Sequence, residues 1–191
     1  ERHPDARLIY IGEKGGNFSD IPKSSTLFDA CYFVYAGKLR RYHGESWLKR
    51  LTDIKTMALN IRDIFWLIIG TVQSAFLVRK LHADAALLKG GYVCVPVGYG
   101  CTVAKIPFIT HDSDAVPGLS NRIIGRYATL HAVALGSAHY PYPPQKTRVV
   151  GVPANPQYSH HKNPTDRLKK KYGLTNNKPT LLVTGGSQGA R

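Results

Sequence analysis

Short apolar runs alternate with longer polar or amphipathic stretches along the chain. The runs lie at residues 8–11, 30–35, 85–88, 106–110, 131–135, 148–152 and 180–184. Runs of this length, separated by helical or loop stretches, are typical of buried strands in a parallel sheet with crossover connections. The pattern therefore predicts an α/β fold.

The longest periodic segment covers residues 46–80 and predicts a helix. Its apolar side chains recur at spacings of three and four residues, which places them on one helix face. They are Leu51, Ile54, Ala58, Ile61, Phe65, Ile68, Val72 and Phe76. Two interpretations stay open: the helix packs on the sheet, or it also presents an apolar patch to a bilayer surface.

The most apolar part of this segment, residues 64–78, is too short to span a bilayer. It has 15 residues and contains Gln73, whereas a spanning helix needs about 20 mostly apolar residues. Basic residues precede it, namely Lys38, Arg40, Arg41, Lys49, Arg50 and Lys55. Because basic residues beside an apolar face favour anionic lipid, an anionic membrane surface is a candidate partner.

The composition adds an electrostatic preference. The 191 residues include 26 Lys and Arg against 12 Asp and Glu, a formal charge of +14, and 43% are hydrophobic. This apolar content excludes a disordered tail, and the three cysteines lack the spacing of a metal site or a disulfide scaffold. The charge suits nucleic acid, a phosphorylated metabolite or an anionic lipid head group. We expect no bound metal and no cofactor.

A change of character over residues 153–179 predicts a domain boundary near residue 155. Four prolines, a His pair and a Lys run fall in this stretch, which is typical of a linker followed by a short charged helix. Because the chain begins without Met and stops within a glycine-rich turn, we expect a fragment truncated at both ends.

Two glycine turns and one polar cluster are the candidate sites. Gly90–Gly91 and the turn at 185–189 follow apolar runs, and a helix that starts at such a turn points free N–H groups at a phosphate. His111, Asp112 and Asp114 follow the run at 106–110, where open α/β sheets bind ligands and where a His beside carboxylates suits proton transfer. An alternative interpretation stays open, in which Asp112 or Asp114 caps the next helix and the glycines serve turn geometry only.

Four motifs in one order resemble the family-28 glycosyltransferases. They read Gly-Gly-Tyr-Val at 90–93, His-Asp-Ser-Asp-Ala-Val-Pro-Gly-Leu-Ser-Asn at 111–121, Gly-Val-Pro at 151–153 and Gly-Gly-Ser-Gln-Gly-Ala-Arg at 185–191. The resemblance covers nearly the whole chain. It implies a GT-B architecture, in which two Rossmann-like domains, each a parallel sheet with flanking helices, enclose a cleft.

The resemblance implies that residues 1–155 are most of the acceptor-side domain, without its first strand and Gly-rich loop. Residues 156–191 are then a linker with the first strand and glycine turn of the nucleotide-sugar domain. We expect this chain alone to be inactive, because a family histidine and most of the uridine pocket lie outside it.

The resemblance also implies roles for individual residues. Gly90, Gly91, Tyr92 and Asn121 are implied to face the acceptor diphosphate, and His111 with Asp112 to manage the proton or position the acceptor. Contacts to the donor UDP-GlcNAc are implied for Asp114, Asn155, Gly185, Gly186, Ser187, Gln188 and Gly189. Two of these depart from the family pattern, since Asp114 stands in place of an amide and Asn155 in place of a frequent arginine.

The implied function is transfer of N-acetylglucosamine, with inversion, from UDP-GlcNAc to undecaprenyl-linked lipid I in peptidoglycan synthesis. The implied location is the cytoplasmic side of the cell membrane, as a peripheral protein. A relative that uses another nucleotide sugar or lipid acceptor is the first alternative. A basic nucleic-acid-binding protein is the distant one. We expect no nucleic-acid partner, because the basic residues are not interleaved with aromatic residues as a stacking platform requires.

Overall fold

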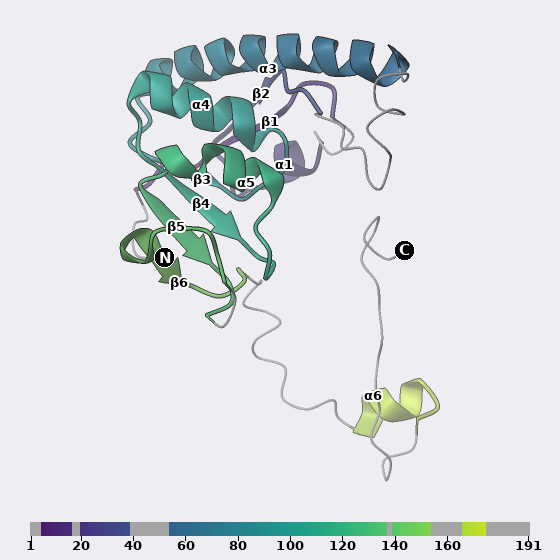
Figure 1. Cartoon of the computed structure of the whole chain (residues 1–191). Helices are drawn as coiled ribbons and strands as arrows, with labels where there is room; N and C mark the ends of the chain where they lie inside the picture. Colours follow the sequence, from purple (N-terminus) through teal and green to yellow (C-terminus); the bar gives the residue numbers. More distant parts are fainter. Residues whose placement is uncertain (1–4, 17–19, 39–53, 137–138, 154–165, 175–191) are drawn as a thin grey trace. The chain divides into compact units, whose positions relative to one another are not determined.

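The computed structural model describes residues 5–16, 20–38, 54–136, 139–153 and 166–174. The chain divides into two compact units, residues 1–152 and 153–191. In the second unit the described residues form helix α6 (Asp166–Lys171) and the turn after it. All other described elements belong to the first unit (Figure 1).

The described strands of the first unit form two parallel sheets. In one, β1 (Ile9–Glu13) pairs with β2 (Ala30–Val34). In the other, the order is β3 (Ala86–Leu88), β4 (Phe108–Asp112), β5 (Leu130–Val133) and β6 (Thr147–Val149). The predicted α/β fold is confirmed, and so is a strand at each apolar run up to residue 152. The run at 180–184 lies outside the described residues.

On the sides away from β2 and β4, the edges of β1 and β3 have no strand partner among the described residues. Both edges nevertheless belong to one core, because Ile11 of β1 and Leu88 of β3 pack in the same apolar cluster. Their carboxyl ends are joined by a hydrogen bond that the Tyr92 hydroxyl donates to the Glu13 carboxylate. Side chains, rather than a backbone ladder, therefore connect the two sheets.

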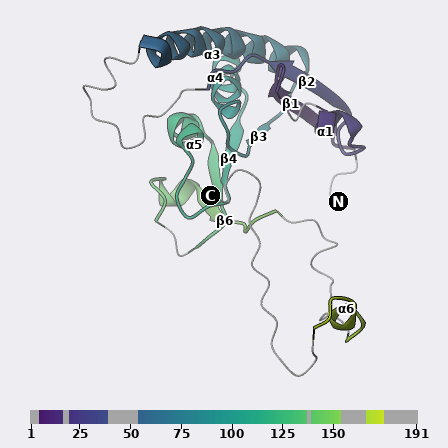
Figure 2. The same cartoon turned by 90° about the vertical axis from the view of Figure 1, so that its right-hand side faces the viewer.

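Helix α3 (Ile54–Lys80) runs along α4 (Cys94–Ala104), as both views show (Figures 1 and 2). Small residues permit this close packing. A Cβ at Gly70 of α3 would approach Pro96 of α4 to 3.1 Å and would collide with the Tyr35 carbonyl oxygen, and one at Gly100 of α4 would collide with Ser74 of α3. Since helix backbones approach closely only where side chains are small, the two glycines fix the line of contact.

Short helices complete the connections. Helix α1 (Asp20–Ser24) lies between β1 and β2. Between β4 and β5 the chain forms α5 (Leu119–Ile124) and the 3₁₀ turn η1 (Gly125–Tyr127). A second 3₁₀ turn, η2 (Pro144–Lys146), precedes β6. The apolar core beneath α3, α4 and α5 includes Val34, Val78, Leu88, Phe108 and Ile124.

The apolar stripe predicted on α3 is confirmed as one face, but packing of that face on the sheet is wrong. Its large members are exposed, at 55% for Ile61, 63% for Phe65, 57% for Ile68, 66% for Val72 and 67% for Phe76. The buried side of the helix instead carries small or polar residues, which are Asp63, Gly70, Ser74 and Ala75, with Val78. Because small and polar residues contribute little to an apolar pattern, the periodicity traced the outer face. Leu51 lies outside the described residues.

Helix α3 is longer than the segment at residues 64–78, which on its own is too short to span a bilayer. By length and composition alone, Met57–Lys80 could cross a membrane. Core helices of soluble proteins meet the same criterion, so one such helix does not by itself indicate a membrane span. Here Ser74, Ala75 and Val78 are buried against the rest of the unit, so this side of α3 is part of the folded domain.

Candidate functional site

The carboxyl ends of the parallel strands gather several polar side chains and one glycine turn. Glu13 ends β1, the turn Gly90–Gly91 follows β3, and His111 and Asp112 end β4. Parallel strands present their carboxyl ends at one edge of the sheet, where open α/β sheets bind ligands. This edge is therefore the candidate site.

The glycine turn adopts a backbone that only glycine tolerates well. The φ angles are 100° at Gly90 and 87° at Gly91, in a region that costs other residues about 1–2 kcal/mol. A Cβ at Gly91 would meet no atom within 4 Å, and one at Gly90 would approach only the Asn121 amide nitrogen, at 3.8 Å. Both glycines thus serve turn geometry, and open space in front of Gly91 leaves its backbone accessible to a ligand.

Helix α4 starts directly after this turn. Its first N–H groups bond back into the turn, from Cys94 to the Gly91 carbonyl at 3.1 Å and from Val95 to the Tyr92 carbonyl at 3.2 Å. No side chain caps the helix at Val93. The positive end of an 11-residue helix therefore points toward the candidate site, which favours a negatively charged group there.

Tyr92 is held by a cluster that the sequence did not reveal. Its hydroxyl donates to Glu13, the Lys38 ammonium lies 3.8 Å from the same carboxylate, and that ammonium also sits 4.8 Å from the centre of the Tyr92 ring. Burial, followed by the hydrogen bond to Glu13 and its charge, raises the pKa of Tyr92 above its ordinary value. Tyr92 therefore stays protonated and fixed beside the glycine turn. No local pattern links positions 13, 38 and 92.

His111 is buried and oriented by two partners. Its Nε2 lies 3.1 Å from the Gly151 carbonyl oxygen and its Nδ1 lies 3.4 Å from the Ser113 hydroxyl. A carbonyl oxygen only accepts, so Nε2 must carry a proton, and in the neutral ring Nδ1 then accepts from Ser113. The basic nitrogen of His111 is consequently Nδ1, on the side of Ser113.

Asp112 is fully engaged in holding the surrounding backbone. Its Oδ1 accepts from the Gly118 N–H at 3.2 Å and the Asn121 amide at 2.9 Å, and its Oδ2 accepts from the Tyr142 hydroxyl at 2.7 Å. Neighbouring residues on a strand point to opposite faces, which places the Asp112 side chain on the other face of β4 from His111. The structure therefore does not bring these two side chains together, and the catalytic role expected for Asp112 stays a prediction.

Tyr142 anchors the connection between β5 and β6 onto this carboxylate. Burial, then the hydrogen bond to Asp112 and its charge, raises the pKa of Tyr142 above its ordinary value. The Tyr140 hydroxyl donates to the Asp114 carbonyl oxygen at 2.9 Å. Two tyrosines from the β5–β6 connection thus hold the loop after β4, a role that the sequence did not indicate.

Asn121 lies behind the glycine turn, where its carbonyl oxygen lacks a partner. Its Nδ2 donates to the His111 carbonyl oxygen and to Asp112, both at 2.9 Å. Its Oδ1 is buried and makes no hydrogen bond. A buried acceptor without a donor costs about 1–3 kcal/mol, so this oxygen is an unsatisfied polar group next to the candidate site. The predicted acceptor-side residues Gly90, Gly91, Tyr92 and Asn121 are brought together.

The predicted donor-side residues are only partly visible. Asp114 is exposed, at the loop after β4. Asn155, Gly185, Gly186, Ser187, Gln188 and Gly189 lie outside the described residues. Within the described residues, no group of three or more His, Cys, Asp or Glu could hold a metal ion.

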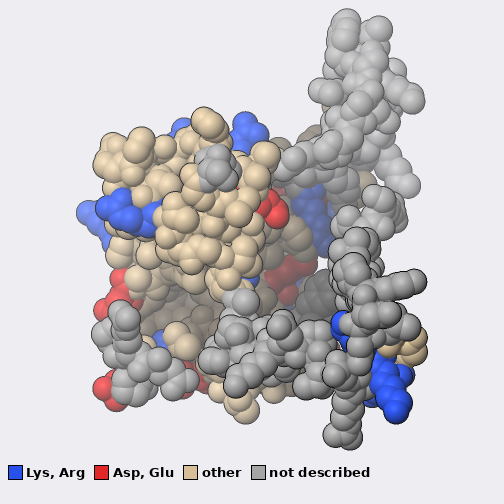
Figure 3. All heavy atoms as spheres, turned by 90° about the horizontal axis from the view of Figure 1, so that it is seen from below, with Lys and Arg blue, Asp and Glu red and all other residues tan. Residues whose placement is uncertain are grey.

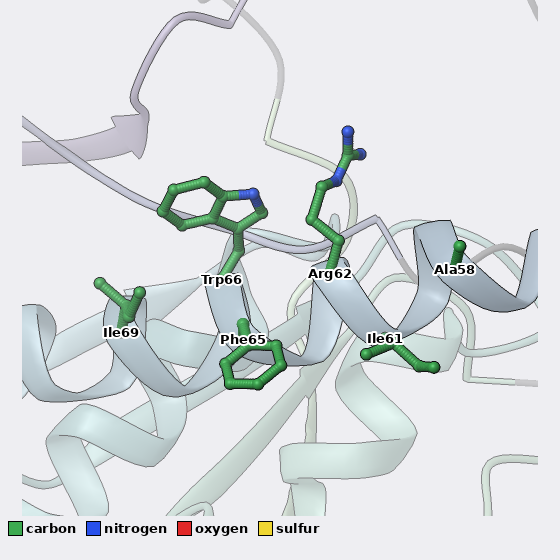
Figure 4. A pocket seen from close by; sticks show the side chains of 6 residues that line it. All are labelled: Ala58, Ile61, Arg62, Phe65, Trp66 and Ile69. Atoms are coloured by element: carbon green, nitrogen blue, oxygen red, sulfur yellow. The ribbon is translucent and has the colours of Figure 1, made fainter.

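The second surface feature is a shallow apolar groove on α3 (Figure 4). Its volume is about 410 Å³, and its lining residues are Ala58, Ile61, Arg62, Phe65, Trp66 and Ile69. Trp66 stacks on Tyr35 with ring centres 4.3 Å apart. Arg62 places a positive charge at the groove and pairs with Asp63 at 3.0 Å. The exposed side of α3 thus combines an apolar surface with a cation.

Comparison with known proteins identifies related sequences. Residues 4–133 match the model of the glycosyltransferase family 28 N-terminal domain. An enzyme of Bacillus cytotoxicus named UDP-N-acetylglucosamine–N-acetylmuramyl-(pentapeptide) pyrophosphoryl-undecaprenol N-acetylglucosamine transferase is 31% identical over 191 residues, which is 99% of this chain and 47% of the relative. The enzyme of the same name from Bacillus pumilus is 30% identical, over 98% of this chain and 47% of the relative. The chain thus spans about half the length of the curated relatives that it matches.

One solved structure shares the fold. The crystal structure of Acinetobacter baumannii MurG superposes with a TM-score of 0.56 at 19% identity, and the match covers 81% of this chain and 39% of that chain. At this identity the similarity supports the fold, and it agrees with the Rossmann-like parallel arrangement of the first unit.

Proposed function

Since the chain belongs to glycosyltransferase family 28, we propose that it is the acceptor-side part of an enzyme that transfers N-acetylglucosamine from UDP-GlcNAc to undecaprenyl-linked lipid I. The observation that supports this most is the 31% identity, over 99% of the chain, with an enzyme whose name describes this transfer. The product would be lipid II, a precursor of peptidoglycan.

The glycine turn is the proposed binding site of the acceptor diphosphate. Positive φ angles and the open space in front of Gly91 let a phosphate approach the backbone, and the uncapped start of α4 offers its dipole. Tyr92, fixed by Glu13, provides a hydroxyl edge beside the turn.

His111 is the proposed base that accepts the proton released in the reaction. The reaction is an inverting displacement, in which a hydroxyl of the acceptor sugar attacks the anomeric carbon of the donor while UDP leaves with the electron pair of the broken bond. A base accepts the proton of the attacking hydroxyl. The Nδ1 atom of His111, which faces Ser113, suits this task, whereas Asp112 acts by positioning the loop and α5.

We propose that sequence outside this chain completes the site. The edges of β1 and β3 away from β2 and β4 are unpaired among the described residues, and we propose that a further strand, with the Gly-rich loop of the family, lies between them. The domain division at about residue 155 and the donor contacts of residues 185–189 belong to the same proposal. The domain that binds the nucleotide sugar would be supplied mostly by sequence outside this chain.

The exposed face of α3 is the proposed contact with the membrane. Ile61, Phe65, Ile68, Val72 and Phe76 form a continuous exposed apolar stripe, and such a face binds the interface of a bilayer when basic residues flank it. Arg62 lies within the helix, and Arg79 and Lys80 lie in its last turn. Because the opposite side of α3 is buried in the domain, the helix would lie on the bilayer rather than cross it. The protein would then be peripheral, on the cytoplasmic side.

A nucleic-acid-binding function finds less support. On the face of the first unit shown in Figure 3, the described Lys and Arg side chains lie in separate patches, with uncharged and acidic side chains between them. A protein that tracks a phosphate backbone requires a continuous positive groove with aromatic side chains for stacking. A titration of the full-length protein with duplex and single-stranded DNA at physiological salt would decide, since submicromolar affinity would favour this alternative.

The experiment that tests the proposal incubates the full-length protein with radiolabelled UDP-GlcNAc and lipid I in detergent. The expected result is label in the lipid fraction as lipid II. Parallel reactions with other UDP-sugars and other polyprenyl diphosphate sugars test the first alternative. Transfer in one of those reactions, with none from UDP-GlcNAc to lipid I, would replace the proposed substrates by the ones that react.

A further inference from the structure

A second pocket lies on the face of the sheet that does not carry the His111 side chain. It has a volume of about 430 Å³ and is bounded by α5 and η1 on one side and by the connection between β5 and β6 on the other. Crossovers between parallel strands are usually helical. The described part of this one is instead a Tyr-Pro segment at residues 140–143, with a bend at 141–142, followed by η2, and residues 141–143 of that segment line the pocket.

The floor of this pocket is rigid. His131 of β5 is buried, its Nδ1 lies 2.8 Å from the Thr110 hydroxyl, and its ring stacks on Tyr142 at 3.9 Å with the planes nearly parallel. Gly125 fits closely here, because a Cβ would approach the rings of Tyr142 and His131 to 3.2 and 3.4 Å. The shape of the pocket is therefore set by packed aromatic groups.

The walls of the pocket bring three cations together. Arg122 and Arg126 are four residues apart on α5 and η1, so their side chains share one face of the helical turn, and Lys146 comes from η2 on the opposite wall. No carboxylate pairs with any of them among the described residues. Lys146 donates only to the Ala128 carbonyl oxygen, at 3.3 Å.

The Asp112 carboxylate, which contacts the pocket through Tyr142, is already used. Asp112 lies behind Tyr142, where its oxygens accept from Tyr142, Asn121 and Gly118. The cations of the pocket thus exceed this buried negative charge by two. Like charges four residues apart repel each other, and an anion between the two walls would remove this repulsion while it accepts charge-assisted hydrogen bonds from Arg and Lys.

We propose that this pocket binds an organic phosphate between Arg122, Arg126 and Lys146. Arginine suits a phosphate because its planar group offers paired donors to two oxygens, and the apolar walls of Tyr142, Pro141 and Pro143 suit the organic part. The phosphate comes either from a soluble metabolite or from a phospholipid head group. Arg122, Arg126 and Lys146 are distinct from the residues proposed for the transfer reaction, and the pocket lies on the other face of β4 from His111, so binding here is tested separately from transfer.

The test measures binding of glycerol 3-phosphate to the full-length protein by titration calorimetry, with UDP-GlcNAc present at saturation to occupy the donor site. Two charge-assisted hydrogen bonds predict a dissociation constant of about 1 mM or lower. In Arg126→Gln the affinity is expected to fall about tenfold, as for loss of one such bond, and in Lys146→Gln to fall likewise. Lys105→Gln, which removes an exposed cation at the end of α4, is the matched control and should bind normally.

A second arm distinguishes the sources of the phosphate. It compares vesicles of phosphatidylglycerol with vesicles of phosphatidylcholine, for the wild type and for Arg126→Gln. A head-group ligand is supported if the preference for phosphatidylglycerol falls in Arg126→Gln and not in Lys105→Gln. The proposal is overturned if neither arm depends on Arg126. It is also overturned if Gly91→Ala abolishes binding while Arg126→Gln retains it, because the anion would then lie at the glycine turn.

Discussion

The exposed face of α3 makes the sharpest quantitative prediction. Phe65 and Phe76 are 63% and 67% exposed, and 11 residues separate them, so they lie on the same side of the helix. Full burial of a Phe side chain contributes about 1.5–3 kcal/mol. Insertion of two such side chains that are each about two-thirds exposed therefore stabilises the membrane-bound state by about 2–4 kcal/mol.

The double variant Phe65→Ser, Phe76→Ser removes this contribution. It should lower the partition coefficient of the full-length protein onto phosphatidylglycerol vesicles by at least about 30-fold, measured by vesicle sedimentation. The fold should persist, because neither ring is part of the core. Val149→Ser is the control, since Val149 is 62% exposed on β6 and should bind as the wild type does. Partitioning within twofold of the wild type, or an equal loss in the control, would refute the membrane role of this face.

Three further predictions concern stability, measured by urea unfolding of the full-length protein. Tyr142→Phe loses the hydrogen bond to Asp112 at 2.7 Å and should destabilise the domain by about 1–2 kcal/mol. Tyr140→Phe loses a hydrogen bond to a neutral carbonyl and should destabilise the domain less. Equal losses of stability in the two variants would contradict the role given to the carboxylate. Gly70→Ala places a Cβ against the Tyr35 carbonyl and should destabilise the domain by at least about 2 kcal/mol. Gly118→Ala is the control, because no atom lies within 4 Å of its added Cβ, and it should change the stability by no more than about 0.5 kcal/mol. A Gly70→Ala variant as stable as the wild type would disprove the close contact of α3. Burial lowers the pKa of His131, an effect that the charge of Asp112 opposes and that of Lys146 supports. The unfolded state therefore binds more protons than the folded state as the pH falls below about 6.5, and the stability should decrease there. The same pH dependence in His131→Gln would show that another group is responsible.

The strands were predictable because their signal is local. Each described strand coincides with a short apolar run, as with Phe108 and Ile109 in β4, which is buried and flanked by a turn. The gap between β1 and β3 was not visible in the same way, since pairing depends on residues far apart in the chain. The resemblance to the family, rather than periodicity, supplied the expectation of a missing first strand.

Helix α3 shows where periodicity misleads. The regular stripe that contains Phe65 and Phe76 is the exposed face, and the packed face depends on Gly70, Ser74 and Ala75. Close approach of two helices selects small residues, which an apolar pattern does not register. A long helix that is apolar on its outer face therefore indicates a surface function rather than a core.

The candidate site was predictable in its residue types and less so in its contacts. The polar cluster after β4 was found, but alternation along the strand separates His111 from Asp112. Glu13, Lys38 and Tyr142 were missed because they reach the site from other elements. Their only signal in the sequence is a polar or aromatic residue near the end of a predicted strand, which is too common to single them out.

The central claim is that residues 1–152 serve the acceptor rather than the donor, and Gly91→Ala in the full-length protein tests it most directly. Gly173→Ala is the matched control, because Gly173 also has a positive φ, 67°, and open space around it. The measurement compares the KM for lipid I, the turnover and the dissociation constant of UDP-GlcNAc. We expect Gly91→Ala to impair transfer to lipid I at least about tenfold, while UDP-GlcNAc binds as in the wild type and Gly173→Ala is unaffected. Normal transfer to lipid I with weakened binding of UDP-GlcNAc would contradict the claim.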